Sequence, residues 1–291
     1  EVILVDDHST DDTAARTNLP PNFRVINSQG IGKKEAIKSG ITVAVGETIV
    51  TTDADCHAGD NWLTAISEQL QHSEASMLIG PVTMKSDGRL IQDIQQLDFY
   101  ALQISGAAAA IINRPVFCSG ANLVFNRSKY LKYHYLMQGS HLASGDDVFL
   151  LHLLKQKGQK ILFIRDNRAI VTTAPEPSFV KFIKQRMRWG GKSKAYNDLD
   201  TILLALCVLS ANMVLVITLV GALIWPTLWL TAMCGWILKI IADVTLLQSG
   251  KKFFGTTYKP KALIIYMLIY PFILCFTALA GLLFTTNWKH K

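Results

Sequence analysis

The sequence predicts an α/β domain built on a mainly parallel sheet and followed by three membrane-spanning helices. Strand-like and helix-like segments alternate through residues 1–200, as they do where crossover helices join parallel strands. Long apolar segments fill residues 201–291. The charges divide at the same point, because residues 201–291 hold seven Lys and one acid, Asp243, whereas residues 1–200 are nearly neutral.

The spacing of apolar residues predicts the elements of the first part in turn. Short apolar runs that end in acidic residues are typical of strands, and runs with apolar residues at helical spacing are typical of helices. In a parallel sheet, ligands bind at the carboxyl ends of the strands. The expected strands are 2–5, 47–52, 77–82 and 160–164, and the expected helices are 33–44, 62–70, 92–113 and 146–157.

Three apolar segments, 202–225, 228–247 and 262–284, are each long enough to cross a membrane. At about 1.5 Å per residue, each spans a hydrocarbon core of roughly 30 Å. Buried helices of a soluble domain are the alternative, but so few charges make it the weaker one. Lys239 and Asp243 lie four residues apart on one face of the second segment, and we favour a self-neutralising structural pair over a functional site.

The short loops predict the orientation of these segments, because Lys and Arg gather on the cytosolic side. Basic residues precede the first segment and occupy loop 248–261, whereas the link 226–227 has none. We therefore expect residues 1–200 in the cytosol and the tail 288–291 outside, in a multi-pass protein of a bacterial inner membrane. Since Glu1 begins directly in a strand-like run, we also expect a missing N-terminal piece.

Composition excludes two other classes of site. The formal net charge of +7 comes mostly from residues 201–291, and no basic stripe with interleaved aromatic residues is present, so we expect no nucleic-acid partner. The five Cys have no CxxC spacing, so neither a disulfide framework nor a zinc site is expected. The pattern is typical of a protein in a reducing cytosol.

Two carboxylates one residue apart, Asp53 and Asp55, directly follow the predicted strand 47–52. Both can reach one hard cation there, and Mg²⁺ and Mn²⁺ take oxygen ligands that bridge to phosphate oxygens. Many solvated loops contain the same two residues by chance. The position after an apolar strand favours a metal site.

A second acidic pair, Asp6 and Asp7, ends the first predicted strand, where a carboxylate can accept hydrogen bonds from a base or a ribose hydroxyl. Residues 30–34 (GIGKK) then open a helix. Glycines, a helix N-terminus and the lysines Lys33 and Lys34 suit a diphosphate group. An ordinary exposed helix start is the alternative.

Together these motifs resemble the nucleotide-binding half of family-2 glycosyltransferases with the GT-A fold, a Rossmann-like α/β fold. The runs VDDHSTDDT, GKKEAI and GETIVTTDADC carry the resemblance, which extends through most of residues 1–200. The family's opening strand would precede Glu1, in agreement with the expected missing piece.

Three further segments extend the resemblance. Residues 117–122 resemble the family's acceptor loop. The pair Asp146-Asp147 falls where the family has an acidic motif often written TED, although this chain has Gly145 and Asp146 in place of Thr and Glu. Residues 185–189 (QRMRW) match the Q-x-x-R-W motif of membrane-bound members.

The resemblance implies a role for each group. It implies a metal-dependent enzyme that uses Mg²⁺ or Mn²⁺ and a nucleotide-sugar donor, most commonly a UDP-sugar, with inversion at the anomeric carbon. A GT-A domain over 1–175, an amphipathic interfacial segment over 176–200 and transmembrane helices over 201–291 would follow. The implied site residues are Asp147 as base with Asp146 beside it; Asp55 and Asp53 at the metal; Asp6, Asp7, Lys33, Lys34, Asp53 and Arg188 for the nucleotide sugar; and Gly120, Asn122, Gln185 and Trp189 for the acceptor.

Three functions compete at this stage. One is a single sugar transfer to a lipid, lipid-linked or glycan acceptor of the cell envelope, and we favour it. The second is a processive polysaccharide synthase of the cellulose, hyaluronan or chitin synthase type, which the Q-x-x-R-W motif supports. The third is a non-catalytic membrane scaffold or transporter subunit, which the complete set of motifs disfavours.

Overall fold

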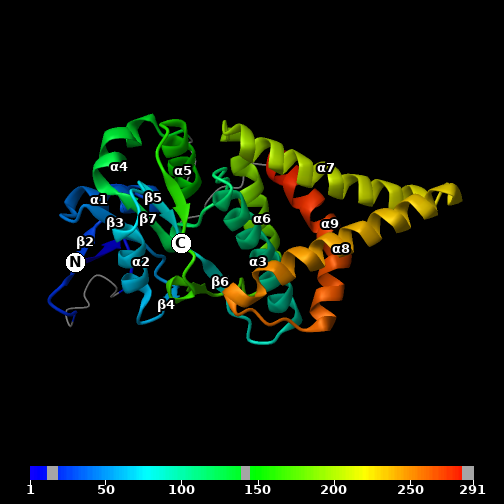
Figure 1. Ribbon diagram of the computed structural model, residues 1–291, viewed down its shortest axis with the longest axis horizontal. Coiled ribbons are helices and arrows are strands. Elements are labelled where there is room, and N and C mark those ends of the chain that lie inside the picture. Colours follow the sequence, from blue (N-terminus) through cyan, green and yellow to red (C-terminus); the bar gives the residue numbers. More distant parts are fainter. Residues whose placement is uncertain (12–18, 139–144, 284–291) are drawn as a thin grey trace.

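The computed structural model describes residues 1–11, 19–138 and 145–283. The end of the third predicted span and the tail 288–291 therefore lie outside the described residues. Figure 1 shows an α/β part that contains the strands and a helical part that ends in two long helices extending away from it. The helices α3 and α6 lie between these two parts.

The strands form three small sheets. Strands β1 (Val2–Asp6) and β2 (Phe23–Asn27) pair in parallel. The four-stranded sheet has the order β3-β7-β5-β8, and the three-stranded sheet has the order β4-β9-β6. Their bounds are β3 Thr48–Thr51, β4 His57–Ala58, β5 Met77–Ile79, β6 Val82–Met84, β7 Leu123–Asn126, β8 Ile161–Phe163 and β9 Val171–Thr173.

The sheets are mixed rather than mainly parallel. Strand β7 follows the long helix α3 and lies between β3 and β5, antiparallel to both. Strand β5 pairs in parallel with β8, as the alternating pattern predicts. The sequence pattern did not predict the inserted strand β7. Its four residues are too few to show an alternation of apolar and polar residues, and they pair only with segments distant in sequence.

The predicted strand 77–82 is two strands in different sheets, β5 and β6, and the chain breaks at Gly80-Pro81. Pro81 has no backbone N–H to donate to a ladder. A Cβ at Gly80 would lie 2.2 Å from the side chain of Asn122, so only glycine leaves room there. The Asn122 amide donates to the carbonyl of Pro81 at 2.8 Å, and this bond holds the break in place.

The helices of the first part confirm the predicted periodicities within a few residues. The long helix α3 buries Leu97 completely, and α5 buries Leu151 and Leu154 against the same core. This core lies between the sheets and the helices that lead to the membrane segments. The helices are α1 Lys33–Val43, α2 Trp62–Gln71, α3 Leu90–Ile111, α4 Arg127–Tyr133, α5 Asp146–Gln156 and α6 Phe179–Lys192.

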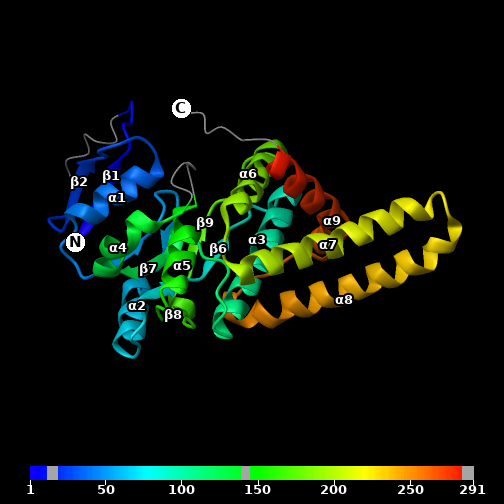
Figure 2. The ribbon, with the colours of Figure 1, turned by 90° about the horizontal axis from the view of Figure 1, so that it is seen from above.

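Three helices are long and apolar enough to cross a membrane, and they confirm the three predicted segments within the described residues. They are α7 (Leu199–Ala222), α8 (Trp229–Phe254) and α9 (Pro260–Leu283). Helices α7 and α8 meet at the end far from the α/β part and diverge toward it in Figure 1, whereas they lie along each other in the view of Figure 2. Helix α9 continues through Pro271 without a break. Many large apolar side chains of α7 and α8 point outward, as in helices solvated by lipid.

The α/β part is fixed to these helices by close backbone contacts. A Cβ at Gly281 of α9 would lie 2.5 Å from the Met187 carbonyl oxygen and 2.8 Å from the Gly191 nitrogen. The backbones of α6 and α9 can therefore approach this closely only because position 281 is a glycine. The Tyr100 hydroxyl of α3 donates to the Leu247 carbonyl of α8 at 2.9 Å. These contacts hold α6, which carries the QRMRW motif, between the two parts.

Candidate active site

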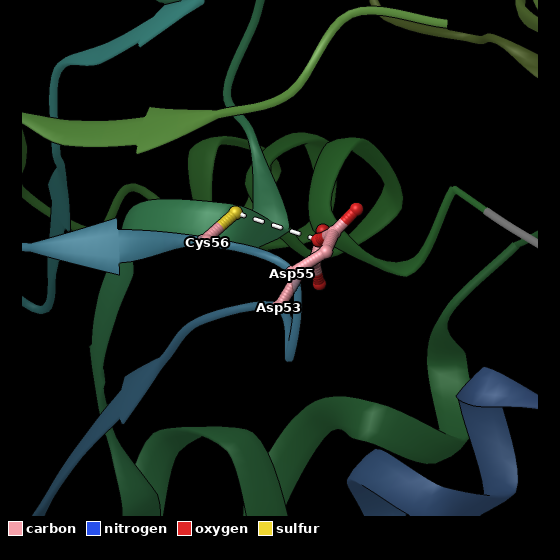
Figure 3. Close-up of side chains that lie close together, drawn as sticks. All are labelled: Asp53, Asp55 and Cys56. Carbon is pink, nitrogen blue, oxygen red and sulfur yellow. Dashed lines mark hydrogen bonds between the residues drawn. The ribbon is translucent and has the colours of Figure 1, made fainter. Parts of the chain in front are cut away.

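The side chains of Asp53 and Asp55 follow β3, at the edge of the four-stranded sheet (Figure 3). One ligand atom from each, together with the Cys56 sulfur, lies within 4.8 Å of the others. Asp55 is exposed, and Asp53 is half-buried. Burial raises the pKa of the Cys56 thiol to about 11, so sulfur stays protonated at neutral pH. The two carboxylates therefore make up an oxygen donor set, which fits a hard cation.

The two lysines at the start of α1 form ion pairs with two of the three acidic pairs that the sequence predicts as site residues. Lys33 makes an ion pair with Asp53. Lys34 Nζ lies 3.3 Å from Asp146 Oδ1. Burial opposes the charge of Lys33, but the Asp53 carboxylate more than offsets it and raises the pKa of Lys33. The lysines predicted to bind the diphosphate thus lie between the Asp53/Asp55 pair and the Asp146/Asp147 pair.

The glycine loop before α1 is hydrogen-bonded to the Asp6/Asp7 pair. The Gly32 N–H donates to both carboxylate oxygens of Asp7, at 2.8 and 3.0 Å. Gly32 has a φ of 97°, a backbone angle that residues with a side chain rarely adopt. Asp6 is nearly buried and accepts from the Ser9 N–H at 3.3 Å. Asp7 therefore fixes the position of the glycine loop, and both acids lie at the end of β1.

Asp146 and Asp147 form the first turn of α5, which follows Gly145 in the left-handed region. The Asp147 carboxylate accepts from the Gly120 N–H and from its neighbour Val148, each at 2.9 Å. Burial raises the pKa of Asp146, and the nearby Lys34 opposes that shift. A carboxylate at a helix N-terminus is stabilised by the helix dipole, and Asp147 is held in one orientation by two backbone donors.

Gly120 is the point at which Lys33 and Asp147 approach each other. A Cβ at this position would lie 3.7 Å from Asp147 Oδ2 and 3.8 Å from Lys33 Nζ. The Thr51 hydroxyl donates to the Gly120 carbonyl at 2.9 Å, so the loop is also joined to the end of β3. The structure therefore brings the predicted metal, diphosphate and base residues to one loop.

Asn122, an expected acceptor-binding residue, is fully buried below this loop. Its amide donates to the carbonyls of Pro81 and Ala169, each at 2.8 Å, and its oxygen accepts from the Trp62 indole at 3.1 Å. These contacts use both ends of the amide. The side chain thus supports the loop from beneath, and it is Gly120 that faces the open side.

The QRMRW residues lie on α6, beside the site and next to the membrane helices. Gln185 donates to Glu176 at 2.9 Å. Burial lowers the pKa of Arg188, and Glu176 partly offsets the shift. Trp189 packs against Phe99, with ring centroids 6.4 Å apart. Trp189 and Cys56 pack against the same small apolar cluster.

Lys192, at the end of α6, also lies near Asp147, although the sequence motifs did not predict it there. Burial lowers the pKa of Lys192, while the charge of Asp147 opposes the shift. Its side chain lies against Gly145, 3.2 Å from the position of a Cβ there. In the sequence Lys192 was only one of several basic residues before the first span; its position three residues after Trp189 on a helix was the available signal.

Comparison with known proteins identifies the family. Residues 1–192 match Glycosyltransferase like family 2, which is about two thirds of this chain. The chain therefore belongs to that family, and its α/β part has the GT-A type of fold. No curated protein matches the sequence.

Several solved structures are similar in fold. Glucosyl-3-phosphoglycerate synthase from Mycobacterium tuberculosis with phosphoglyceric acid is 17% identical with a TM-score of 0.42, over 65% of this chain and 66% of that one. The same enzyme with Mn²⁺ and UDP-glucose is 16% identical with a TM-score of 0.38, over 62% of each chain. This chain spans less than two thirds of the length of these neighbours.

Proposed function

We propose that the chain is an inverting, metal-dependent glycosyltransferase that moves a sugar from a nucleotide-diphosphate sugar to a lipid, lipid-linked or glycan acceptor at the cytosolic membrane face. One observation carries the proposal. The lysine at the start of α1, the acids after β3 and the acid at the start of α5 converge at Gly120. A donor diphosphate, a cation and an acceptor hydroxyl each find a partner there.

The reaction follows from the chemistry of these side chains. The acceptor oxygen attacks the anomeric carbon and forms the new glycosidic bond. The bond from that carbon to the diphosphate breaks, and its electron pair leaves with the nucleoside diphosphate. Asp147 takes the acceptor's proton as general base. A single displacement of this kind inverts the anomeric centre.

The negative charge on the leaving diphosphate must be stabilised as it develops. Lys33 and Lys34 are placed for this task at a helix N-terminus, which itself favours anions. Donor binding would move Lys33 from Asp53 to the diphosphate. Arg188 and Lys192 would supply further positive charge for the diphosphate from α6.

Asp53 and Asp55 would hold the divalent cation, because their oxygens lie close together and the neighbouring thiol is protonated. The Lys33 ammonium already contacts Asp53, so this carboxylate accepts a cation in the ligand-free protein. Bound Mg²⁺ or Mn²⁺ would supply a positive charge for the diphosphate oxygens. UDP-glucose and Mn²⁺ occur together in a structure of the mycobacterial synthase, and a UDP-sugar is the first donor to test.

The acceptor would approach from the side of α6. Trp189 offers a flat apolar face, and such faces stack on sugars. The membrane helices start only a few residues further on, at Leu199. This arrangement supports an acceptor anchored in the same membrane, and the Lys and Arg residues before α7 and in loop 248–261 support residues 1–200 in the cytosol, in a protein that we propose belongs to a bacterial inner membrane.

A panel of nucleotide sugars, read out by nucleotide release, tests the proposal. Purified full chain in lipid nanodiscs is incubated with each donor and Mn²⁺ or Mg²⁺, with and without chelator. We expect release from one donor class, and we expect chelator to abolish it. Absence of release from every donor, with the cation present and membrane lipid as acceptor, contradicts the proposal.

A further inference from the structure

A large cavity lies between the α/β part and the membrane helices. Its volume is about 780 Å³, within the range of about 300–1,000 Å³ that small-ligand sites occupy. Helices α3, α6, α7, α8 and α9 all contribute to its wall. Most lining side chains are aliphatic or small, among them Leu204, Val208, Leu238, Ile273 and Leu274. This surface suits a hydrocarbon chain better than a glycan, whose hydroxyls need polar partners.

One charged group in the wall, Arg186, has an ion pair with Asp98 but uses few of its hydrogen-bond donors. Arg186 is nine-tenths buried, with 10% of its side chain exposed, and Nη2 lies 2.5 Å from Asp98 Oδ2. The contact does not have hydrogen-bond geometry. Among the described residues, none of the three guanidinium nitrogens has a hydrogen-bond partner. Since a guanidinium offers five N–H donors in a fork that fits phosphate, the donors that Asp98 does not use can bind phosphate oxygens.

One side chain of the cavity wall, Trp189, also packs near the candidate active site. Trp189 lines the cavity, and it also packs against the small cluster that Cys56 contacts beside Asp55. The Arg186 guanidinium lies 4.2 Å from the centre of the Trp189 ring. A ligand with its phosphate at Arg186 would thus have its chain among α7, α8 and α9 and its far end beyond Trp189.

We propose that this cavity binds the lipid part of the acceptor, an amphiphile with a long hydrocarbon chain and a phosphate in its headgroup. The hydrocarbon occupies the aliphatic space between the membrane helices, and Arg186 donates hydrogen bonds to the phosphate. A hydroxyl carried beyond that phosphate points toward Asp147. This assignment rests on the proposed sugar transfer and selects the lipid-linked acceptor from the three classes considered there.

The test uses hexadecyl phosphate that carries a photoactivatable diazirine in its chain. The full chain in phosphatidylcholine nanodiscs is irradiated with this probe, digested and examined by mass spectrometry. We expect the label on cavity-lining residues such as Leu204, Val208 and Ile273, above the level on outward-facing residues. Equal labelling of inward and outward faces of α7 overturns the proposal.

Two tryptophan substitutions separate the cavity from the lipid-facing surface of the same helix. Ala205 lines the cavity, whereas its neighbour Leu206 is 57% exposed and does not. We expect Ala205→Trp to lower cavity labelling by about tenfold, because the indole fills the space that the chain needs. Leu206→Trp should leave it within about twofold of wild type. Equal labelling in the two variants contradicts a cavity-bound chain.

The headgroup assignment is tested with a second probe, the corresponding hexadecanol with the same diazirine. Wild type should prefer the phosphate over the alcohol by about tenfold, as expected for a charge-assisted hydrogen bond. The double variant Asp98→Asn/Arg186→Gln removes both charges together, so no unpaired charge stays buried, and it should lose this preference. Retention of the preference in the double variant overturns the role of Arg186.

Native cysteines provide a control without substitution. Cys207 of α7 lines the cavity, whereas Cys234 of α8 does not, and both are exposed. Hexadecyl phosphate should slow alkylation of Cys207 several-fold and leave Cys234 unchanged. UDP binding, measured separately with Mn²⁺, distinguishes the two proposals. Loss of lipid binding with UDP binding intact overturns only the cavity assignment, whereas intact lipid binding without nucleotide release overturns only the sugar transfer.

Discussion

The two carboxylate pairs on either side of Gly120 are held in different ways. Asp53 and Asp55 lie on a loop after a strand, where Asp55 is exposed and half-buried Asp53 forms an ion pair with the flexible Lys33. Asp147, by contrast, sits in the first turn of α5 and accepts two backbone N–H bonds. A loop pair can rearrange around a cation that comes and goes, whereas a proton acceptor has to keep one position. The difference in support therefore agrees with the proposal that one pair holds the metal and the other supplies the base.

The largest expected effect is that of Asp147→Asn. Asparagine can still accept from Gly120, so the loop should keep its place, but it cannot take the acceptor's proton. We expect kcat to fall by about 10²–10⁴-fold, the usual contribution of a general base, with UDP binding unchanged. Sugar transfer measured at saturating donor checks this.

Asp146→Asn is the matched control for that change. It removes a carboxylate from the same helical turn, together with the ion pair to Lys34, and leaves the Gly120 contact intact. We expect it to lower kcat by less than about tenfold. If the two variants lose activity equally, the assignment of the base to Asp147 is wrong.

The next largest effect is expected at the loop pair. Asp55→Asn removes a charged ligand, and a contact to a charged group contributes about 1.5–3 kcal/mol, so the cation should bind about 10- to 100-fold more weakly. Titration of nucleotide release with Mn²⁺ measures this. Excess Mn²⁺ should restore much of the rate, which it cannot do for Asp147→Asn.

Cys56→Ser sharpens the same comparison. The thiol belongs to the Asp53/Asp55 cluster, but sulfur is a soft ligand. Mg²⁺ and Mn²⁺ prefer oxygen ligands. We expect the Mn²⁺ dependence of this variant to stay within about threefold of wild type. A large loss of cation affinity would make sulfur a ligand and contradict the all-oxygen site.

The pKa values of the two lysines near these carboxylate pairs, Lys192 and Lys33, are shifted in opposite directions, and this difference predicts a pH effect. Burial lowers the pKa of Lys192, whereas Asp53 raises that of Lys33 against the effect of burial. A lysine with a lowered pKa loses its charge at a lower pH than an ordinary one. The alkaline fall of kcat/KM should therefore begin with Lys192.

Replacement of Lys192 tests that order. In Lys192→Arg the cation persists at high pH, so the alkaline limb should move to higher pH by about one unit or more. Lys192→Met should lower kcat/KM by about tenfold at neutral pH and abolish this limb. The pH profile of kcat/KM measures both, and an unmoved limb in the arginine variant assigns it to another group.

Local patterns predicted most of the elements and the acidic clusters, but not how distant segments meet. Strand β3 and the acids after it were predicted from an apolar run that ends in Asp53, and helix α5 from its periodicity. The break at Gly80 was missed because its cause, Asn122, lies 41 residues from the Pro81 carbonyl that it binds. Lys192 was missed for the same reason, since only the fold places it beside Asp147.

The membrane part illustrates the same limit. The three spans follow from composition alone, because twenty apolar residues in sequence need no partner to be recognised. The cavity among them does not, since its wall combines side chains of five helices. Arg186 lies inside the QRMRW motif, yet its contact with Asp98 on α3 depends on how α6 and α3 pack.

The smallest expected effect concerns the pair inside α8. Lys239 and Asp243 contact each other one helical turn apart, and the lysine lies 5.1 Å from the centre of the Tyr270 ring. Removal of one partner alone leaves a charge among apolar helices, so Asp243→Leu should destabilise the protein by about 3 kcal/mol. The double variant Lys239→Met/Asp243→Leu leaves no charge and should unfold within about 1 kcal/mol of wild type. Thermal unfolding in detergent compares the single and double variants, and equal stability of the double variant and wild type would show that this pair, unlike those around Gly120, can be replaced without loss of the fold.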